Sequence, residues 1–415
     1  MITLPISAEA RNGGYVAVCE GSAGYDGRMD VDVVVVGAGP AGATAAIAAR
    51  RGGARVLLLD KAAFPRDKPC GDGIAAEALD VLAGLGVTGV TDGYPPVERL
   101  RLVGPGGGAV ARPLPRPAHT VPRRVFDDRL VRAAQDAGVE FCRHTVRELR
   151  QEPGRTPAGQ ADGSSAGEAG GNAGGRVVID GRFGAGVLIG ADGAGSVVRR
   201  LCGHRPNPPG HVAIAIRGYA PAASPEQVIV TTEARWPAYA WSFPIGDGTA
   251  NVGYGEVLRG AALSRAYLLE RLDHLLTGTR PHSLRAHHLP LSTHRPPPAT
   301  GRVLLAGDAL SLINPLTGEG IFYAVLSGAL AGAAALTADP AAAYLSSLRT
   351  RLGRHLRHSR AATFLTRRPS AVDAAVRAAA RDQRVFDRMT ALGLADGMFD
   401  FRTIGRIGRE LHRRT

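Results

Sequence analysis

A short glycine-rich segment near the start of the chain has the residue types and spacing of a phosphate-binding turn. Residues 37–42, GAGPAG, fit the pattern GxGxxG and stand between a hydrophobic run and a helix-like run. In such a turn the first glycine permits the tight bend, the second lets the backbone approach a pyrophosphate, and the third lets helix and strand pack closely. The N–H groups at the helix start then attract an anion. The residues expected to bind the ligand are Gly37, Gly39, Pro40, Ala41 and Gly42.

A carboxylate follows at the spacing of a ribose contact. Asp60 ends the second hydrophobic run, 18 residues after Gly42, and Lys61 comes directly after it. A carboxylate at this place can accept hydrogen bonds from ribose hydroxyls. We therefore predict a βαβ unit that binds a dinucleotide and includes Asp60 and Lys61, in preference to a glycine-rich turn without a ligand. These features alone do not distinguish NAD from FAD.

Two later glycine-bearing turns also follow buried, strand-like runs. One is GADGAGS, with Asp192 and Gly193, and the other is LLAGDALSLINPLTGEGI, with Asp308. Because such turns leave the ends of parallel strands at one edge of a sheet, we expect all three to surround one long ligand. The uncharged run 321–338 has about the length of a membrane-spanning helix. Its many alanines, glycines and serines favour a buried helix packed closely against a neighbour instead.

The hydrophobic pattern predicts the elements that position these turns. Strands are expected over 31–36 and 55–59, with a helix over 41–50 between them. Runs typical of β-strands and rich in aromatic residues dominate 203–294, and the chain reads as helical after Gly320. The predicted fold is α/β, with a Rossmann-like dinucleotide-binding domain, an antiparallel-sheet substrate domain and a helical C-terminal region.

The composition suggests how these domains alternate along the chain. Residues 1–28 show no period and are expected to be a disordered extension without a signal peptide. Residues 151–175 are low-complexity Gly, Ala and Ser, which favours a flexible insertion at a hairpin tip. The expected segments are 29–90, 121–202 and 297–344 for the dinucleotide-binding domain, 91–120 and 203–296 for the substrate domain, and 345–415 for a basic helical region.

Taken in order, the motifs GxGxxG, ADGxxS and GDAxxxxxPxxGxGI resemble the flavoprotein hydroxylase and reductase superfamily over most of residues 30–340. KPCGDG, together with YAWSFP at 239–244 and NVG at 251–253, resembles the narrower geranylgeranyl reductase family. The resemblance implies FAD as the cofactor, so the Rossmann-like domain is expected to be an FAD-binding domain. It also implies that Arg123, with Arg124 as the alternative, contacts the phosphates or ribityl oxygens of FAD. The other residues that it implies for the cofactor are Asp192, Gly193, Asp308, Gly318, Gly320 and Ile321.

One cysteine is singled out by the same resemblance. Cys70 lies in FPRDKPCGDG, and in family members this loop passes near the flavin ring. Gly71 and Gly73 would permit close backbone approach, so Cys70 and Gly71 are expected at the cofactor. Cys70 is a candidate catalytic residue that shapes the pocket, influences the redox state or helps to protonate the substrate. The alternative is a packing cysteine, since a thiol with a pKa of ~8.5 is mostly neutral.

Alternating aromatic residues suggest a second wall of the site. Tyr239, Trp241 and Phe243 have the spacing that places side chains on one face of a strand. The resemblance implies that this face, with Pro244, lines the substrate pocket, and an aromatic wall without carboxylates suits an isoprenoid or another apolar chain. The alternative is ordinary sheet core. His287-His288 has no third ligand nearby, so no metal site is expected.

Positive charge is concentrated at the C-terminal end. The chain of 415 residues carries a net charge of +13, and residues 349–415, with 16 arginines and six acidic residues, account for +10. No nucleic-acid module is visible, so no nucleic acid partner is expected. An apolar stripe in this region favours a helix docked on the body, with peripheral membrane contact as the second hypothesis. The stripe consists of Leu345, Leu348, Leu352 and Leu356.

These features predict an FAD-dependent reductase that saturates carbon–carbon double bonds of a prenyl chain or a similar apolar small molecule. NADPH or NADH is the expected electron donor and would bind transiently, because no second dinucleotide-binding βαβ unit is evident. The alternative is an FAD-dependent monooxygenase of an aromatic or polyketide-type metabolite. The four cysteines show no CxxC pair and no zinc spacing, which is typical of a cytoplasmic protein. The second hypothesis adds that the protein contacts the inner face of the membrane as a peripheral protein.

Overall fold

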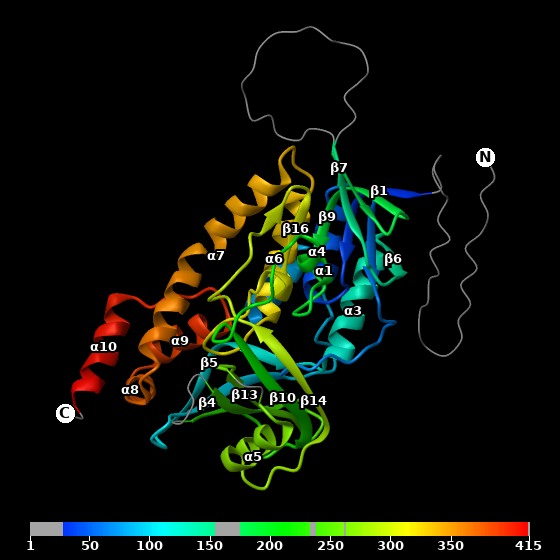
Figure 1. The fold of residues 1–415 in the computed structure, drawn as a ribbon. Coiled ribbons are helices and arrows are strands. Elements are labelled where there is room, and N and C mark those ends of the chain that lie inside the picture. Colours follow the sequence, from blue (N-terminus) through cyan, green and yellow to red (C-terminus); the bar gives the residue numbers. More distant parts are fainter. Residues whose placement is uncertain (1–27, 154–174, 233–237, 261–262, 414–415) are drawn as a thin grey trace, which may run out of the picture.

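The structure is a computed structural model in which two sheets and a set of C-terminal helices form the body (Figure 1). It describes residues 28–153, 175–232, 238–260 and 263–413.

Two expected segments fall largely outside the described residues. Of the expected N-terminal extension only Arg28 is described, and of the expected insertion at 151–175 only the two ends are described. The strands that flank the insertion, β7 (Leu149–Glu152) and β8 (Arg176–Ile179), pair antiparallel, as a hairpin requires.

The first sheet carries the glycine-rich turns. Its central strands pair parallel, so their carboxyl ends share one edge, and β8 pairs with the amino-terminal half of β9. The second half of β1 and all of β2 except its last residue are buried runs of Val and Leu, as strands covered on both faces require. The order across the sheet is β15 (Ala299–Thr300), β16 (Val303–Leu305), β9 (Phe183–Gly190), β1 (Met29–Val36), β2 (Val56–Asp60) and β6 (Glu140–Arg143).

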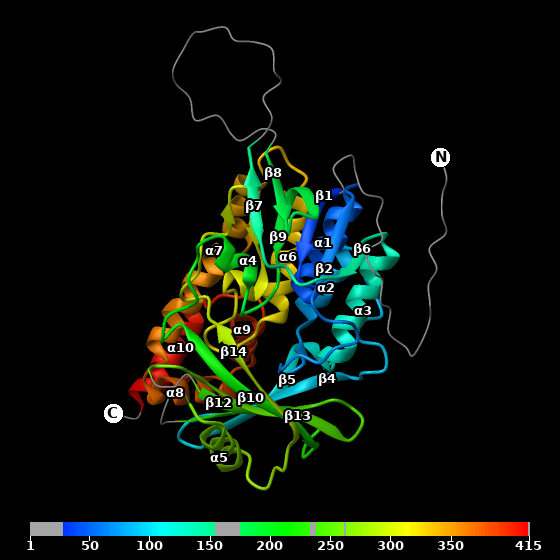
Figure 2. The same cartoon turned by 45° about the vertical axis from the view of Figure 1, so that its right-hand side comes forward.

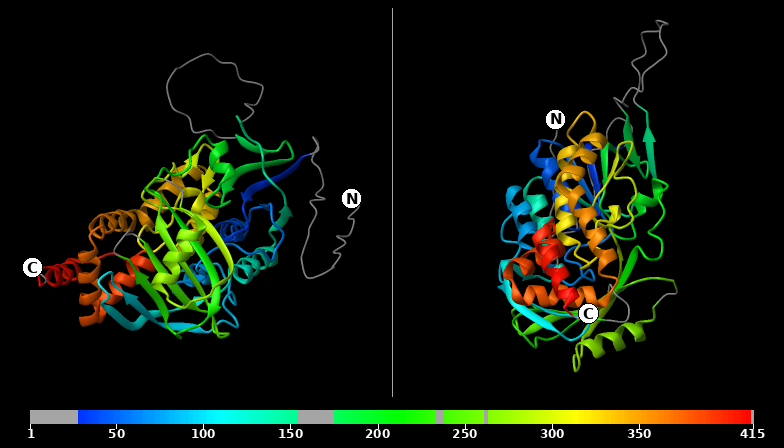
Figure 3. Two further views of the ribbon diagram at one scale, coloured as in Figure 1. Left: turned by 60° about the horizontal axis from the view of Figure 1, so that its bottom comes forward. Right: turned by 90° about the vertical axis from the view of Figure 1, so that its left-hand side faces the viewer.

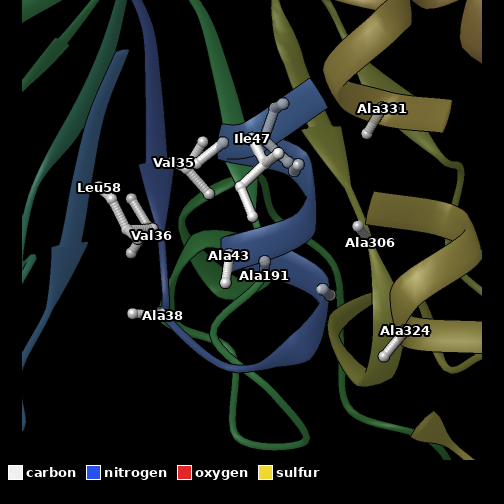
Figure 4. Packing of buried hydrophobic residues seen from close by; sticks show 14 of the residues in the cluster. Val35, Val36, Ala38, Ala43, Ile47, Leu58, Ala191, Ala306, Ala324 and Ala331 are labelled. Carbon is white, nitrogen blue, oxygen red and sulfur yellow. The ribbon is translucent and has the colours of Figure 1, made fainter. Parts of the chain in front are cut away.

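Helix α1 (Pro40–Arg51) is packed between this sheet and α6 (Ile321–Ala334). Figure 4 shows Ile47 on α1 close to Val35 on β1. On the other side the two helices approach so closely that a Cβ at Gly328 would lie 2.2 Å from the carbonyl oxygen of Ala41. Among the described residues no helix is long and apolar enough to cross a membrane. Residues 321–334 of the uncharged run form the closely packed helix that its small residues predict, whereas 335–338 follow the helix and 336–338 are exposed.

The second sheet is mostly antiparallel and lies beside the first (Figure 2). Its one parallel pair joins β11 to β4. The order is β14 (His282–Pro290), β10 (Val212–Pro221), β13 (Thr249–Val257), β12 (Ala238–Pro244), β11 (Gln227–Thr231), β4 (Pro96–Val103), β5 (Ala109–Thr120) and β3 (Gly73–Ile74). The short strand β3 belongs to this sheet although it lies within the range 29–90.

Helices cover both sheets and complete the chain. α5 packs on the second sheet, and α8 and α9 pack on its strand β5. The remaining elements are α2 (Ala76–Gly84), α3 (Arg123–Asp136), α4 (Val197–Leu201), α5 (Arg265–Leu275), the 3-10 turn η1 (Gly307–Leu310), α7 (Pro340–Leu365), α8 (Pro369–Arg381), α9 (Gln383–Leu394) and α10 (Phe401–His412). The fold is thus the predicted α/β architecture with a helical C-terminal region.

The leucine stripe on α7 faces the body of the protein. Leu352 is fully buried, and Leu348 and Leu356 pack against the main core. The stripe therefore serves docking, which leaves other residues to be considered for any contact with a membrane.

Candidate active site

A cavity of about 550 Å³ lies where the carboxyl edge of the first sheet meets the second sheet. The three glycine-bearing turns, the loop 64–73 and the face of β12 all contribute to its wall. The sequence-predicted residues that line it are Gly37, Gly39, Pro40, Ala41, Asp60, Lys61, Cys70, Gly71, Arg123, Asp192, Gly193, Tyr239, Trp241, Phe243, Asp308, Gly318, Gly320 and Ile321. Gly42 and Pro244 are not among the lining residues.

The first turn is built from backbone that only glycine can supply. Gly37 has φ +99°, and a Cβ there would lie 2.5 Å from the carbonyl oxygen of Ala191. A Cβ at Gly42 would lie 1.7 Å from the carbonyl oxygen of Gly37. Gly42 thus allows the helix to pack against the turn, which explains why it does not face the cavity. Gly39 caps α1 without any side-chain hydrogen bond to the first turn of the helix.

Asp60 holds the same turn from the neighbouring strand. Its carboxylate accepts hydrogen bonds from the backbone N–H of Ala38 at 2.7 Å and of Ala62 at 2.8 Å. A carboxylate oxygen has more than one lone pair. Asp60 can therefore fix the turn and still accept a hydroxyl from a ligand in the cavity.

Two guanidinium groups lie over the glycine turn. A Cβ at Gly39 would be 3.5 Å from Nη2 of Arg66 and 3.8 Å from Nη2 of Arg123. Both arginines pair with the buried carboxylate of Asp127, Arg66 at 3.0 Å and Arg123 at 2.6 Å. Arg123 is buried while Arg124 is exposed. The structure therefore puts Arg123, and not its neighbour, beside the position that a diphosphate would occupy.

The two later carboxylates have different local roles. Asp192 accepts hydrogen bonds from the hydroxyl of Ser196 at 2.5 Å and the backbone N–H of Val197 at 2.6 Å, so it fixes the start of α4. Asp308 forms an ion pair with Lys68 at 3.1 Å. Burial acts to raise the pKa of Asp308, but the surrounding positive groups, Lys68 foremost, together outweigh burial and lower the pKa. Asp308 is therefore a buried carboxylate that is ionised at neutral pH.

Loop 64–73 connects the turns to the second sheet through Asn251 on β13. The side-chain amide of Asn251 donates to the carbonyl oxygen of Cys70 at 2.8 Å and to the carboxylate of Asp72 at 2.7 Å. Its oxygen accepts from the indole N–H of Trp241 at 2.9 Å. One buried amide thus joins the KPCGDG, YAWSFP and NVG motifs, which explains why they occur together.

The titratable groups of this loop are perturbed by burial. Burial raises the pKa of the Cys70 thiol, although the charge of Arg123 opposes it. Cys70 is thus a neutral thiol on the cavity wall at neutral pH. Burial also raises the pKa of Asp72 to about 6, against the opposing hydrogen bonds from Tyr219 and Asn251. Asp72 is fully buried behind the loop and does not line the cavity.

The start of α6 carries a carboxylate that the sequence motif did not single out. Glu319 lines the cavity and accepts a hydrogen bond from the backbone N–H of Phe322 at 2.8 Å. Burial raises its pKa to about 7. Glu319, a group that changes charge near neutral pH, therefore occupies part of the N-terminus of α6.

The opposite wall is aromatic and apolar. The ring of Phe243 lies over the loop, 3.5 Å from a Cβ placed at Gly71 and 3.6 Å from one placed at Gly73. The hydroxyl of Tyr239 donates to the carbonyl oxygen of Thr317, which ties the aromatic strand to the turn before α6. Further apolar lining comes from Ile229, Leu289, Leu291, Ile313, Leu316 and Leu394.

Several lining residues were missed by sequence reasoning. His144 and Thr145 line the cavity after β6, where the only signal was their place at the end of a strand. His287 was considered only as a metal ligand. Its Nε2 is buried without a hydrogen-bond partner among the described residues, and burial lowers its pKa to about 4, so that it is neutral.

The shape and the polar groups of this cavity fit FAD. Gly39 has no side chain, and the Nη2 atoms of Arg66 and Arg123 lie beside the space that this leaves, where their positive charge suits a phosphate. The orphaned Nε2 of His287 offers a polar contact to a ligand in the same cavity. The cavity continues from this charged end to an apolar aromatic end. The class of protein that fold and site define is an FAD-dependent oxidoreductase.

Comparison with known proteins narrows this class. The FAD binding domain family matches residues 30–224. A menaquinone reductase from Mycolicibacterium smegmatis is 34% identical over 350 residues, covering 78% of this chain and 80% of that protein. A digeranylgeranylglycerophospholipid reductase from Methanopyrus kandleri is 33% identical over 347 residues, covering 78% and 86%. The chain belongs to the geranylgeranyl reductase family of FAD-dependent oxidoreductases.

A solved structure shares the whole fold. A geranylgeranyl bacteriochlorophyll reductase-like protein from Thermoplasma acidophilum superimposes with a TM-score of 0.73 at 20% identity, covering 94% of this chain and 99% of that one. At this identity the likeness shows the fold alone.

Proposed function

We propose that this protein is an FAD-dependent reductase that saturates carbon–carbon double bonds of a prenyl chain or a similar apolar substrate. The observation that carries the proposal is the continuity of one cavity from a glycine turn with two arginines to an aromatic wall formed by Tyr239, Trp241 and Phe243. Relatives named as reductases of menaquinone and of digeranylgeranylglycerophospholipid support it.

The cofactor would be held along the carboxyl edge of the first sheet. Gly37, Gly39 and the first turn of α1 would bind the diphosphate, with Arg66 and Arg123 neutralising its charge. Asp60 would bind the ribose beyond it. When bound, FAD supplies hydride to the substrate after it has been reduced, and we propose NADPH or NADH as the transient donor.

The second sheet would orient the alkene and exclude water. Phe243 lies against Gly71 and Gly73, so the aromatic wall and the Cys70 loop form one continuous apolar surface. Such a surface binds an extended hydrocarbon by burial and without directional polar contacts.

Two groups on the cavity wall can hold the proton that saturation requires. Cys70 is a neutral thiol at neutral pH, and Glu319 is partly protonated there because burial raises its pKa to about 7. We propose Cys70 as the donor nearer the aromatic wall. In Cys70→Ala, flavin content should stay unchanged while turnover falls, and Glu319→Gln serves as the matched variant for the other donor.

One experiment separates reduction from oxygenation. The flavin of the purified protein is reduced without oxygen, and geranylgeraniol, whose only reducible groups are carbon–carbon double bonds, is then added. Reoxidation of flavin together with a product heavier by two hydrogens supports the reductase. A product that forms only after oxygen is admitted, and that contains one added oxygen atom, would instead make the protein a monooxygenase.

We further propose that the protein is cytoplasmic and meets its substrate at the inner face of the membrane.

A further inference from the structure

Exposed apolar side chains are concentrated in the C-terminal helices. Seven large apolar side chains are exposed in the described part of the chain, and five of them belong to residues 364–411. The most exposed is Phe401 at 94%. A soluble surface rarely gathers such side chains without a binding partner. The five are Phe364, Leu365, Phe401, Ile404 and Leu411.

The inner face of helix α10 is packed against the rest of the protein. Thr403 and Glu410 are buried, and Ile407 packs against the cluster under α8 and α9. The carboxylate of Glu410 pairs with Arg381 on α8 at 2.6 Å. These contacts fix which side of α10 points away from the protein.

The outward side of α10 is apolar along one edge and basic along the other. Phe401, Ile404 and Leu411 are spaced by three and seven residues, which puts them on one stripe of a helix. Arg402 and Arg409 are exposed beside that stripe. We call these five side chains the α10 face. Figures 1 and 3 show α10 (red) at the outer edge of the helical region.

Charge decides which partner this face suits. Residues 349–415 carry +10 of the net charge, so two copies of the chain meeting through this region would repel each other. An anionic bilayer attracts such a region and accepts aromatic and aliphatic side chains at its interface. α10 has 12 residues, too short to span a bilayer.

We propose that the α10 face rests on an anionic lipid bilayer, with Phe364 and Leu365 at the end of α7 as additional apolar contacts. The inference rests on the proposed function only in that a prenyl lipid would be found in such a bilayer. α9 links the face to the cavity: Leu394 lines the cavity, and Phe401 follows seven residues later, at most ~25 Å away along the chain.

The test is co-sedimentation of the full-length, flavin-loaded protein with vesicles. Vesicles of equal parts phosphatidylcholine and phosphatidylglycerol should bind it, and pure phosphatidylcholine vesicles should bind it far more weakly. The double variant Phe401→Gln/Ile404→Gln should lower the bound-to-free ratio by about tenfold or more, since two large apolar side chains no longer enter the interface. Arg402→Gln/Arg409→Gln should weaken binding only to the anionic vesicles.

A matched pair of single variants controls for general loss of apolar surface. Leu411 on α10 is 37% exposed and Leu201 on α4 is 39% exposed. Leu411→Gln should weaken vesicle binding, while Leu201→Gln should not. Equal vesicle binding by the wild type and both double variants would overturn the proposal. A wild-type protein that does not bind vesicles but forms a dimer that depends on Phe401 would also overturn it. Flavin content and anaerobic alkene reduction in detergent, measured on the same samples, report separately on the proposed function.

Discussion

The two walls of the cavity are built by different means. The wall proposed to bind the cofactor is shaped by its backbone: Gly37 has a positive φ, and Gly39 leaves room under two arginines. The wall proposed to bind the substrate is shaped by single side chains of β12, such as Phe243, that project from a regular strand. The first wall tolerates almost no substitution, whereas the second can change one residue at a time. A family with this construction can keep its cofactor while its substrate varies.

The largest effect should come from a methyl group on the cofactor wall. Gly37→Ala adds a Cβ 2.5 Å from a carbonyl oxygen at φ +99°, whereas Gly53→Ala adds one at φ +95° with nothing within 4 Å. Unfavourable φ costs about 1–2 kcal/mol, and overpacking adds about as much again or more. Thermal unfolding should therefore show Gly37→Ala losing roughly twice the stability that Gly53→Ala loses. Flavin absorbance per chain should fall only in Gly37→Ala, and equal losses in both would contradict the role of the clash.

The second-largest effect should come from Asn251, the residue that connects the two walls. Asn251→Leu removes the partner of the Cys70 carbonyl, the Asp72 carboxylate and the Trp241 indole, all of which are bonded to it. Leaving such groups unpaired should cost about 3 kcal/mol of unfolding free energy, measured by urea titration. Asn207→Leu, which breaks an amide network outside the aromatic wall, is the comparison. Only Asn251→Leu should alter the fluorescence of Trp241.

The pH dependence of stability should report on Asp72. Because its pKa is raised from 3.8 to about 6 in the folded protein, the unfolded chain releases this proton first. The contribution of Asp72 is therefore full below pH 4 and declines as pH rises to about 6, by on the order of 3 kcal/mol. Asp72→Asn removes the titration and keeps one of the two oxygen acceptors. The difference in unfolding free energy between wild type and Asp72→Asn should change across this window; a constant difference would show that Asp72 does not titrate there.

The smallest effect should come from the substrate wall. Phe243→Leu keeps an apolar side chain but exposes part of the loop at Gly71, so flavin content should stay the same and stability should fall by about 1 kcal/mol. The KM for a prenyl alcohol should rise several-fold, up to about tenfold, because apolar contact area is lost. Phe364→Leu on the surface of α7 should change neither quantity. A large loss of flavin in Phe243→Leu would show that the two walls are not separable in this way.

Sequence could predict what depends on local pattern. The three turns were found because each glycine motif directly follows a hydrophobic strand, and the aromatic stripe because side chains alternate along a strand. Sequence could not show that Asp192 fixes α4, that Glu319 covers part of the start of α6, or that Lys68 pairs with Asp308. These outcomes depend on contacts between residues that no periodicity connects. The leucine stripe on α7 illustrates the same limit, since only the fold shows that it faces the core.

Loop 64–73 also has a consequence for when the site can form during synthesis. Its contacts reach 150 residues ahead to Arg217, 181 to Asn251 and 240 to Asp308. Pairings of such sequence separation close late in folding, because the entropy of the intervening chain must be lost first. A nascent chain that has completed its first βαβ unit therefore holds only a fragment of the pocket. Cofactor loading must await the emergence of α6, so truncated translation products should emerge without flavin.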